Sequence, residues 1–329
     1  MNRPVLRLGA AAVTALCLLS LSACGSGDGS TTGSANASPS TSATSGSADS
    51  GSGAGTAITN TWTASTLKAS ALPLGDDSSS TTDPGVGVLY TCQEGNPNAG
   101  GAIADVPWID YSTKTWDSTD KLTVTGENTW PSAVYTEDVQ GSDRVITTNG
   151  EPVATVTGDF PITDEDPAFD YDRNPGSIME DLRTYTLPAA PSVNDQPNCL
   201  GFDAVAILKN GVLMFSGVDG RGDDAVAHEV QDVCGGHPAM TTYHYHSIPP
   251  CLLDKATGAS TVVGYAIDGF PIVVERDAAG NLPTNADLDE CHGRTSPILL
   301  DGELVTSYHY SATQEFPYTI GCFRGTPVS

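Results

Sequence analysis

The fold is best predicted from one short run, Thr242-Tyr243-His244-Tyr245-His246. Side chains alternate between the two faces of a β-strand, so His244 and His246 would lie on one face and the tyrosines on the other. Tyrosine is common in strands, and two imidazoles side by side are half of a metal site. The run therefore predicts a strand that packs through its tyrosines and presents possible metal ligands through its histidines.

The sequence around this run is repeated further along the chain. The near-copy Ser307-Tyr308-His309-Tyr310-Ser311 follows at an offset of 65 residues, and three other matched segments keep their order. Those segments are Asn210-Gly211-Val212 with Asp268-Gly269-Phe270, Cys234-Gly235-Gly236-His237 with Cys291-His292-Gly293-Arg294, and Cys251 with Cys322. Similar offsets in a matched order predict two related β-rich units, residues 204–251 and 262–322, packed about a pseudo-two-fold axis.

Most of the chain beyond residue 57 has the composition of strands and loops. Short runs rich in Thr, Val, Tyr and Ile alternate with Gly, Pro, Asp and Asn, and the 22 prolines are spread too widely for long helices. The predicted fold is mainly β with short helices, in which two related units pack as one disulfide-braced domain. The predicted strands include 121–125, 144–148, 153–157, 204–208 and 261–267.

One segment has the pattern of a helix. The two aspartates at 223–224 can cap its N-terminus, valines recur at helical spacing after them, and the Gly-Gly pair at 235–236 would end it. In such a helix His228 and Asp232 lie four residues apart and share a face, with Glu229 beside that face.

The N-terminus has the pattern of an export signal. Arg3 and Arg7 precede an apolar stretch at 10–21 that is too short for a confident membrane span. The sequence Leu-Ser-Ala-Cys at 21–24 resembles the lipobox of bacterial lipoproteins, which implies removal of a signal peptide and diacylation of Cys24 by chains such as palmitate. The alternative is an ordinary secreted protein.

These features predict where the protein is located. With residues 1–23 removed, Cys24 would carry the lipid, and the Gly, Ser, Thr and Ala of 24–56 would form a flexible linker. The predicted location is the outer face of the cell membrane, with the membrane as a partner through the anchor.

The cysteines fit an oxidising compartment. Six of the eight cysteines follow Cys24, and an even number in an exported domain suggests three disulfides. If the pairing repeats with the two units, the bonds are Cys234–Cys251 and Cys291–Cys322, and Cys92–Cys199 remains. Pairing across the two units is the alternative.

The charge argues against one class of partner. The formal net charge is −26, and loss of the signal peptide with its two arginines would leave 12 basic residues against 40 acidic ones, or −28. Nucleic-acid binding needs a basic patch, so we expect no nucleic-acid partner.

Several segments together resemble the YHYH-domain family of exported bacterial proteins. Besides the repeated run, they include Tyr171-Asp172-Arg173-Asn174-Pro175, the segment 223–229, Gly236-His237-Pro238, the segment 264–270 and the segment 316–325. The resemblance implies a YHYH domain over 158–325, preceded by a β-rich region at 57–157, and it implies no settled activity. The family often has a second complete Tyr-His-Tyr-His and an Asn-Gly-His. Ser311 and Arg294 depart from that pattern, which favours one metal site over two equivalent sites.

The clustered histidines are the candidate metal ligands. All six histidines of the chain lie between 228 and 309. Imidazole nitrogens suit copper or zinc, and calcium fits less well, because the acidic segment 219–224 lacks the ligand spacing of an EF-hand. The alternative is that the histidines form a hydrogen-bonded core. The candidate ligands are His228, His237, His244, His246 and His309.

Three functions are compatible with these residues. The first is binding of a transition metal for capture or delivery. The second is metal-dependent hydrolysis, for which Glu229 is the candidate base. The third is a surface module that binds a protein or a glycan, with structural histidines and an exposed aromatic patch. The candidates for that patch are Trp62, Trp108, Trp116 and Trp130.

Overall fold

The computed structural model describes residues 69–99 and 105–328, which belong to one compact unit that runs from Ala54 to Ser329. The predicted signal peptide, the predicted lipidation site Cys24, the predicted linker and Trp62 lie outside the described residues. Within the described part of the chain, no helix has the length and hydropathy needed to cross a membrane.

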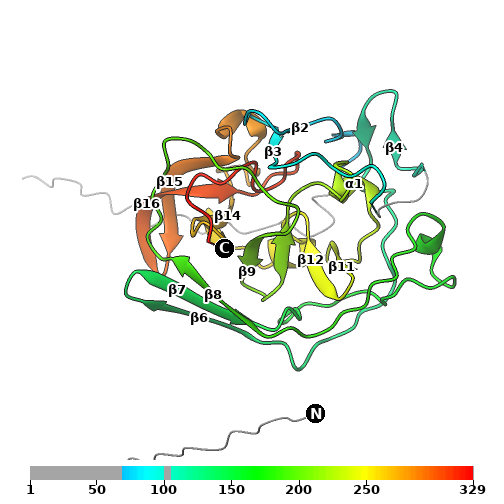
Figure 1. The fold of residues 1–329 in the computed structure, drawn as a ribbon, viewed down its shortest axis with the longest axis horizontal. Coiled ribbons are helices and arrows are strands. Elements are labelled where there is room, and N and C mark those ends of the chain that lie inside the picture. Colours follow the sequence, from blue (N-terminus) through cyan, green and yellow to red (C-terminus); the bar gives the residue numbers. More distant parts are fainter. Residues whose placement is uncertain (1–68, 100–104, 329) are drawn as a thin grey trace, which may run out of the picture. The chain divides into compact units, whose positions relative to one another are not determined.

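An eight-stranded sheet forms the centre of this unit, with the strand order β11-β12-β10-β9-β13-β14-β16-β15. The strands are β9 (Ala204–Leu208), β10 (Leu213–Phe215), β11 (Gly236–Ala239), β12 (Thr242–Tyr245), β13 (Ser260–Ala266), β14 (Pro271–Glu275), β15 (Gly293–Leu300) and β16 (Glu303–Ser311). The order is symmetric. Counted inward from each edge, β11, β12, β10 and β9 occupy the same places as β15, β16, β14 and β13. In Figure 1 the pair β11 and β12 and the pair β15 and β16 lie on opposite sides of β9.

The register confirms the two related units. At the centre of the sheet Ile207 pairs with Tyr265 in antiparallel fashion, which places a pseudo-two-fold axis between β9 and β13. On each side the same pairings follow. Strands β10 and β12 are parallel, as are β14 and β16, and each edge strand is antiparallel to its neighbour.

The tyrosines of the two repeated runs pack into the core. Tyr243 and Tyr308 are buried, and each donates a hydrogen bond from its hydroxyl to an aspartate, Asp232 at 2.7 Å and Asp289 at 3.1 Å. The ring of Tyr243 lies against Gly236, where an added Cβ would be 2.3 Å from the ring. A side chain larger than hydrogen does not fit there, so the glycine before the histidine is required for packing.

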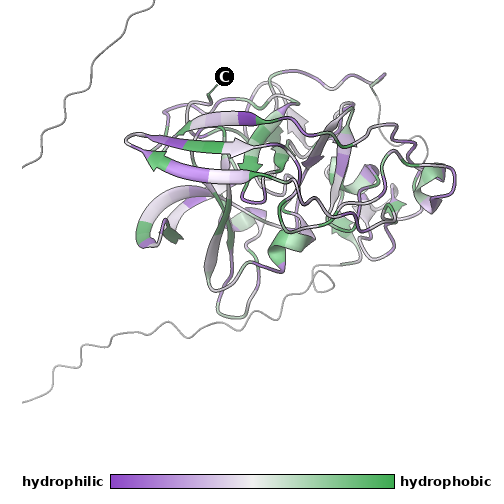
Figure 2. Ribbon diagram, turned by 90° about the horizontal axis from the view of Figure 1, so that it is seen from below, coloured by the Kyte–Doolittle hydropathy of each residue, from purple (hydrophilic) through white to green (hydrophobic). Residues whose placement is uncertain are grey.

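The remaining elements surround this sheet and are short. Figure 2 shows that apolar segments are concentrated on strands and short helices, while many of the loops are hydrophilic. A three-stranded antiparallel sheet contains β6 (Tyr135–Gln140), β7 (Asp143–Thr148) and β8 (Arg183–Pro188). The others are β1 (Leu72–Pro73), β2 (Ser79–Ser80), β3 (Leu89–Tyr90), β4 (Ile109–Asp110), β5 (Thr115–Trp116), α1 (Ala225–His228), α2 (Pro250–Leu253), and the 3₁₀ helices η2 (Pro167–Asp170) and η3 (Asn285–Asp287).

Three of the five strands named in the sequence analysis are present, as β7, β9 and β13. The segments 121–125 and 153–157 are not strands, and each forms only one isolated bridge, Val124 with Asp232 and Thr157 with Asn128. Their partners are irregular segments, so their β-favouring composition does not extend into a ladder.

The predicted helix is present but much shorter than expected. Asp224 caps α1 by accepting hydrogen bonds from Val226 N and Ala227 N, as predicted, but the helix ends at His228. Glu229 is already extended, with φ −81° and ψ 137°. The prediction that His228 and Asp232 share a helical face was therefore wrong. The two adjacent side chains have different partners, since Glu229 lies against His237 and His246 and His228 lies against Asp76.

All three disulfides match the pairing that follows the repeat. Cys234 is bonded to Cys251 and Cys291 to Cys322, one bond within each unit. The third bond, Cys92–Cys199, fastens the N-terminal region to the segment that precedes β9.

Candidate metal centre

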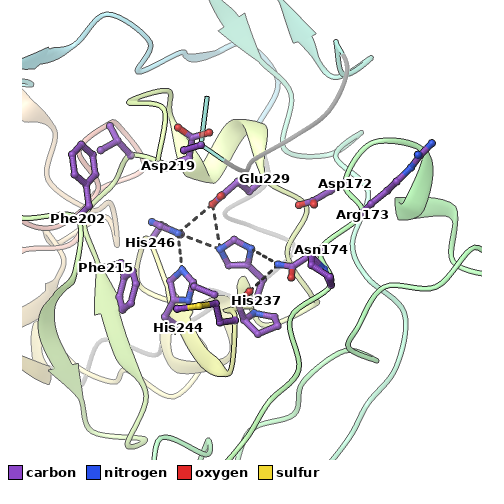
Figure 3. A pocket seen from close by; sticks show the side chains of 17 residues that line it. Asp172, Arg173, Asn174, Phe202, Phe215, Asp219, Glu229, His237, His244 and His246 are labelled. Carbon is purple, nitrogen blue, oxygen red and sulfur yellow. Dashed lines mark hydrogen bonds and ion pairs between the residues drawn. The ribbon is translucent and has the colours of Figure 1, made fainter. Parts of the chain in front are cut away.

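Three imidazoles of the first unit converge on one point. His244 and His246 come from β12 and the residue after it, and His237 lies opposite His244 in the paired strand β11. The Nε2 atom of His246 is 3.0 Å from Nε2 of His244 and 3.2 Å from Nε2 of His237. All three side chains are buried, and Figure 3 shows them pointing toward one another. This group could hold a metal ion.

Glu229 completes the group with an oxygen. Its Oε2 lies 3.2 Å from Nε2 of both His237 and His246. These contacts have ion-pair distances, but Oε2 is buried and makes no hydrogen bond of acceptable geometry. A buried carboxylate oxygen without a hydrogen-bond donor is costly unless a cation neutralises it.

The hydrogen bonds on the far side of two rings determine where their lone pairs lie. Nδ1 of His246 lies 2.5 Å from the carbonyl oxygen of Ser216, and Nδ1 of His244 lies 3.1 Å from that of Thr242. A carbonyl can only accept, so each Nδ1 donates its proton outward and each Nε2 atom faces inward. At 3.0 Å these two Nε2 atoms need either a proton or a metal cation between them.

Four of the six ligand–ligand distances of a tetrahedral site are close to the ideal value. A zinc ion about 2.1 Å from each of four ligand atoms requires those atoms to be about 3.4 Å apart. The four separations given above lie between 3.0 and 3.2 Å, a few tenths of an ångström below that value. Three nitrogens and one carboxylate oxygen form a ligand set suited to zinc or copper.

The electrostatics of the group favour a bound positive charge. Burial alone would raise the pKa of Glu229, but the adjacent His237 and His246 hold it well below its usual range. Burial opposes protonation of His237, yet the carboxylates of Glu229 and Asp172 raise its pKa. Burial and the neighbouring imidazoles lower the pKa of His244 far below its usual range. The group thus combines a carboxylate that is held in its charged form with imidazoles whose pKa values are shifted in opposite directions.

The group forms part of the wall of a cavity of about 560 Å³. The ring of Phe215 stacks on His244 with the centroids 4.0 Å apart and restrains that imidazole. Asp172 and Asn174 lie on the other side, near His237 (Figure 3). Asp172 is buried, accepts a hydrogen bond from Val230 N at 3.2 Å, and has a pKa raised by burial and by Glu229. The cavity therefore reaches the ligand atoms from one side.

The structure does not bring His228 and His309 into this group. The Nε2 atom of His228 lies 3.0 Å from both carboxylate oxygens of Asp76, and that of His309 lies 3.1 Å from Oε1 of Glu275. The early end of α1 separates His228 from Glu229, and β9, β10, β13 and β14 lie between β12 and β16. The remaining histidine, His292, is hydrogen-bonded through Nε2 to the hydroxyl of Thr313.

The second unit contains the counterpart of the metal group in a different form. Arg294 pairs with His309 in the ladder, as His237 does with His244. Its guanidinium donates to both carboxylate oxygens of Glu275, from Nε to Oε1 at 3.0 Å and from Nη2 to Oε2 at 2.6 Å. Ser311 also donates to Glu275. A guanidinium thus neutralises the buried carboxylate, and two of the three imidazoles are missing.

The acidic segment 219–224 holds a turn together through its own chain. Asp219 accepts hydrogen bonds from the backbone N–H groups of Arg221 and Asp223, and Asp224 caps α1. The segment is therefore a turn that leads into the helix.

Two features of the site were not anticipated from the sequence. Glu229 was expected as a base beside the metal, and its oxygen lies among the ligand atoms. Asp172, Asn174 and Phe215 line the cavity and were not named as site residues. The first two lie in the segment Tyr171 to Pro175 that carried the family resemblance, which was a usable signal.

The comparison with protein families gives one match. Residues 184–282 match the family described as YHYH protein. No curated protein and no solved structure matches the chain. The chain therefore carries a YHYH domain. The matched segment contains Glu229, His237, His244 and His246, and it ends before the second run at 307–311.

Proposed function

We propose that the protein binds one transition-metal ion, copper or zinc, through His237, His244, His246 and Glu229. The observation that carries the proposal is the convergence of three buried Nε2 atoms and one buried carboxylate oxygen, with four of their six separations at 3.0 to 3.2 Å. A core of structural histidines is the competing explanation, and it accounts for the second unit, where His309 and Glu275 have acceptable hydrogen bonds. In the first unit it requires an added proton between Nε2 of His244 and Nε2 of His246, at the position where a metal ion would bind.

The proposed location is the outer face of the cell membrane, with Cys24 as the lipid-bearing residue. The lipobox-like sequence at 21–24 supports this location, and three disulfides are typical of an oxidising compartment. The role that follows is capture or delivery of a metal ion outside the cell.

Metal analysis of the purified full chain tests the site. We expect about one equivalent of zinc or copper per chain after loading and removal of free metal. The variant His244→Ala/His246→Ala should retain none. His309→Ala is the matched control, because His309 occupies the place of His244 in the second unit and is equally buried. It should retain one equivalent.

Circular dichroism of each variant establishes that it is folded before its metal content is compared. Equal metal content in the wild type and in the folded double variant would eliminate the proposed site.

The cavity favours a second candidate function, metal-dependent hydrolysis. A catalytic metal keeps an exchangeable position, and a cavity of about 560 Å³ beside the imidazoles gives small molecules access. If Glu229 is a ligand, Asp172 in the same wall is the available base. Adding azide to the cobalt-substituted protein separates the two functions, since the visible spectrum changes only if a position is open.

The third function, a protein- or glycan-binding module, has less support. Trp108 and Trp116 are buried, and Trp130 is half-buried with its Nε1 hydrogen-bonded to Thr157. Among the described residues, the tryptophans therefore do not form the exposed aromatic patch that this function requires.

A further inference from the structure

Two exposed methionines lie at a cavity that adjoins the metal cavity. Of the four methionines in the chain, Met1 lies outside the described residues and Met214 is fully buried. Met179 and Met240 are 60% and 85% exposed. Met240 borders the cavity of the three imidazoles, and both methionines border an adjoining cavity of about 450 Å³ that shares Phe215 with the first. The exposed thioethers are therefore gathered at one place.

Met240 occupies a position where methionine is locally unfavourable. It is the first of the two residues that connect β11 to β12, and its φ is 54°. Glycine is the preferred residue at such a position of a two-residue hairpin turn, and a non-glycine residue with positive φ is uncommon. A large apolar side chain that is strained and almost fully exposed calls for a reason other than packing.

Backbone contacts hold Met179 beside this turn. Ser177 N donates to Met240 O at 2.8 Å, and Met179 N donates to Thr241 O at 3.1 Å. The approach is close because residue 176 is glycine, where a Cβ would lie 2.9 Å from Met240 O. The two thioethers are thus carried by segments that are hydrogen-bonded to each other and not by independent loops.

We propose that Met179 and Met240 form a capture site for cuprous copper, Cu(I), at the mouth of the cavity, and that copper is the ion passed on to the imidazoles. This inference rests on the proposed metal site. Thioether sulfur is a soft, neutral ligand that selects Cu(I) over zinc. In the transfer the sulfur–copper bonds break as Nε2–copper bonds form. Copper remains Cu(I), so the step requires no oxidant or reductant.

Anaerobic transfer of Cu(I) from its complex with the chromophoric chelator bicinchoninate measures this step directly. The test variant is Met179→Leu/Met240→Leu, because leucine conserves volume and removes only the sulfur. We expect it to take up Cu(I) about 10-fold or more slowly than the wild type, at the lower end of the 10–100-fold effect of losing a metal-site partner. Its zinc content should be unchanged. Met214→Leu, which removes a buried thioether, is the control and should behave as the wild type.

The experiment separates the two proposals. Suppose that the wild type binds Cu(I) or zinc, and that the double methionine variant binds Cu(I) as fast and as tightly as the wild type. The capture site is then overturned and the histidine site stands. If the wild type binds neither Cu(I) nor zinc, the histidine site itself is overturned, and the capture site with it. Sulfur scattering in X-ray absorption of Cu(I)-loaded His244→Ala/His246→Ala, lost on adding the methionine substitutions, would support the capture site independently.

Discussion

Replacement of Glu275 with Gln should destabilise the protein by an amount that depends on pH in a defined way. Glu275 is buried in the second unit, where Arg294 donates to both carboxylate oxygens, and His309 Nε2 and the Ser311 hydroxyl lie within hydrogen-bond distance of Oε1. Glutamine has the same shape but lacks the charge. The substitution therefore tests whether this cluster is held together by ion pairing.

The magnitude follows from the pKa of Glu275. Burial alone would raise it, but the hydrogen bonds from His309, Arg294 and Ser311 lower it from 4.5 to about 2. At 1.36 kcal/mol for each pKa unit, this difference corresponds to roughly 3 kcal/mol. Since the folded-state pKa is the lower one, this stability is present above about pH 4.5 and is lost as the pH falls toward about 2.

Urea unfolding followed by tryptophan fluorescence, with the disulfides intact, measures the effect. We expect the free energy of unfolding of Glu275→Gln to be about 3 kcal/mol below that of the wild type at pH 7, and the difference to shrink steadily below pH 4.5. Glu290→Gln is the control, because its pair with Arg324 is partly exposed and should contribute at most about 1 kcal/mol. A difference that stays constant between pH 7 and pH 3, or a loss below about 1 kcal/mol at pH 7, would refute the reasoning.

Three further predictions concern the metal, the packing and the anchor. Zinc at a thousandfold excess over its dissociation constant should stabilise the protein by about 4 kcal/mol and raise Tm by roughly 8–16 °C in calorimetry, and Glu229→Gln should reduce this rise. Gly236→Ala should lower the free energy of unfolding in urea by about 2–3 kcal/mol, because the added Cβ would clash with Tyr243. Gly201→Ala is the control and should lower it far less, because position 201 has room for a methyl group. Cys24→Ser should abolish incorporation of a palmitate analogue and release the protein from the membrane fraction, and membrane retention by this variant would contradict the lipid anchor.

The symmetric part of the fold was predictable because each repeated segment has its own local cause. The alternation in residues 242–246 forces tyrosines and histidines onto opposite faces whatever surrounds the strand. The cysteines and glycines recur with the strands, so the order of the two units and the disulfides follow from the same offsets. Convergence of His237, His244 and His246 needs only a hairpin between them, which is a short-range event.

The partners of the histidines could not be predicted in the same way. Glu229 joins the group because α1 ends one residue before it, and the sequence has a valine pattern that continues to Val233. The end depends on long-range contacts, such as the hydrogen bond from Val230 N to Asp172. Asp76, which binds His228, is 152 residues away from it in sequence, so that pair also depends on the assembled fold.

Comparison of the two units gives the strongest reason to place a cation in the first. Both bury a carboxylate against an imidazole, Glu229 against His237 and His246 and Glu275 against His309, and a buried carboxylate requires a counter-charge. In the second unit Arg294 supplies it from within the chain. In the first unit His237 stands at the position of Arg294, His246 stands at that of Ser311, and Glu229 Oε2 makes no acceptable hydrogen bond. The scaffold therefore meets one electrostatic requirement in two ways, and in the first unit the charge must come from a proton or from a metal ion that three inward nitrogens are arranged to bind.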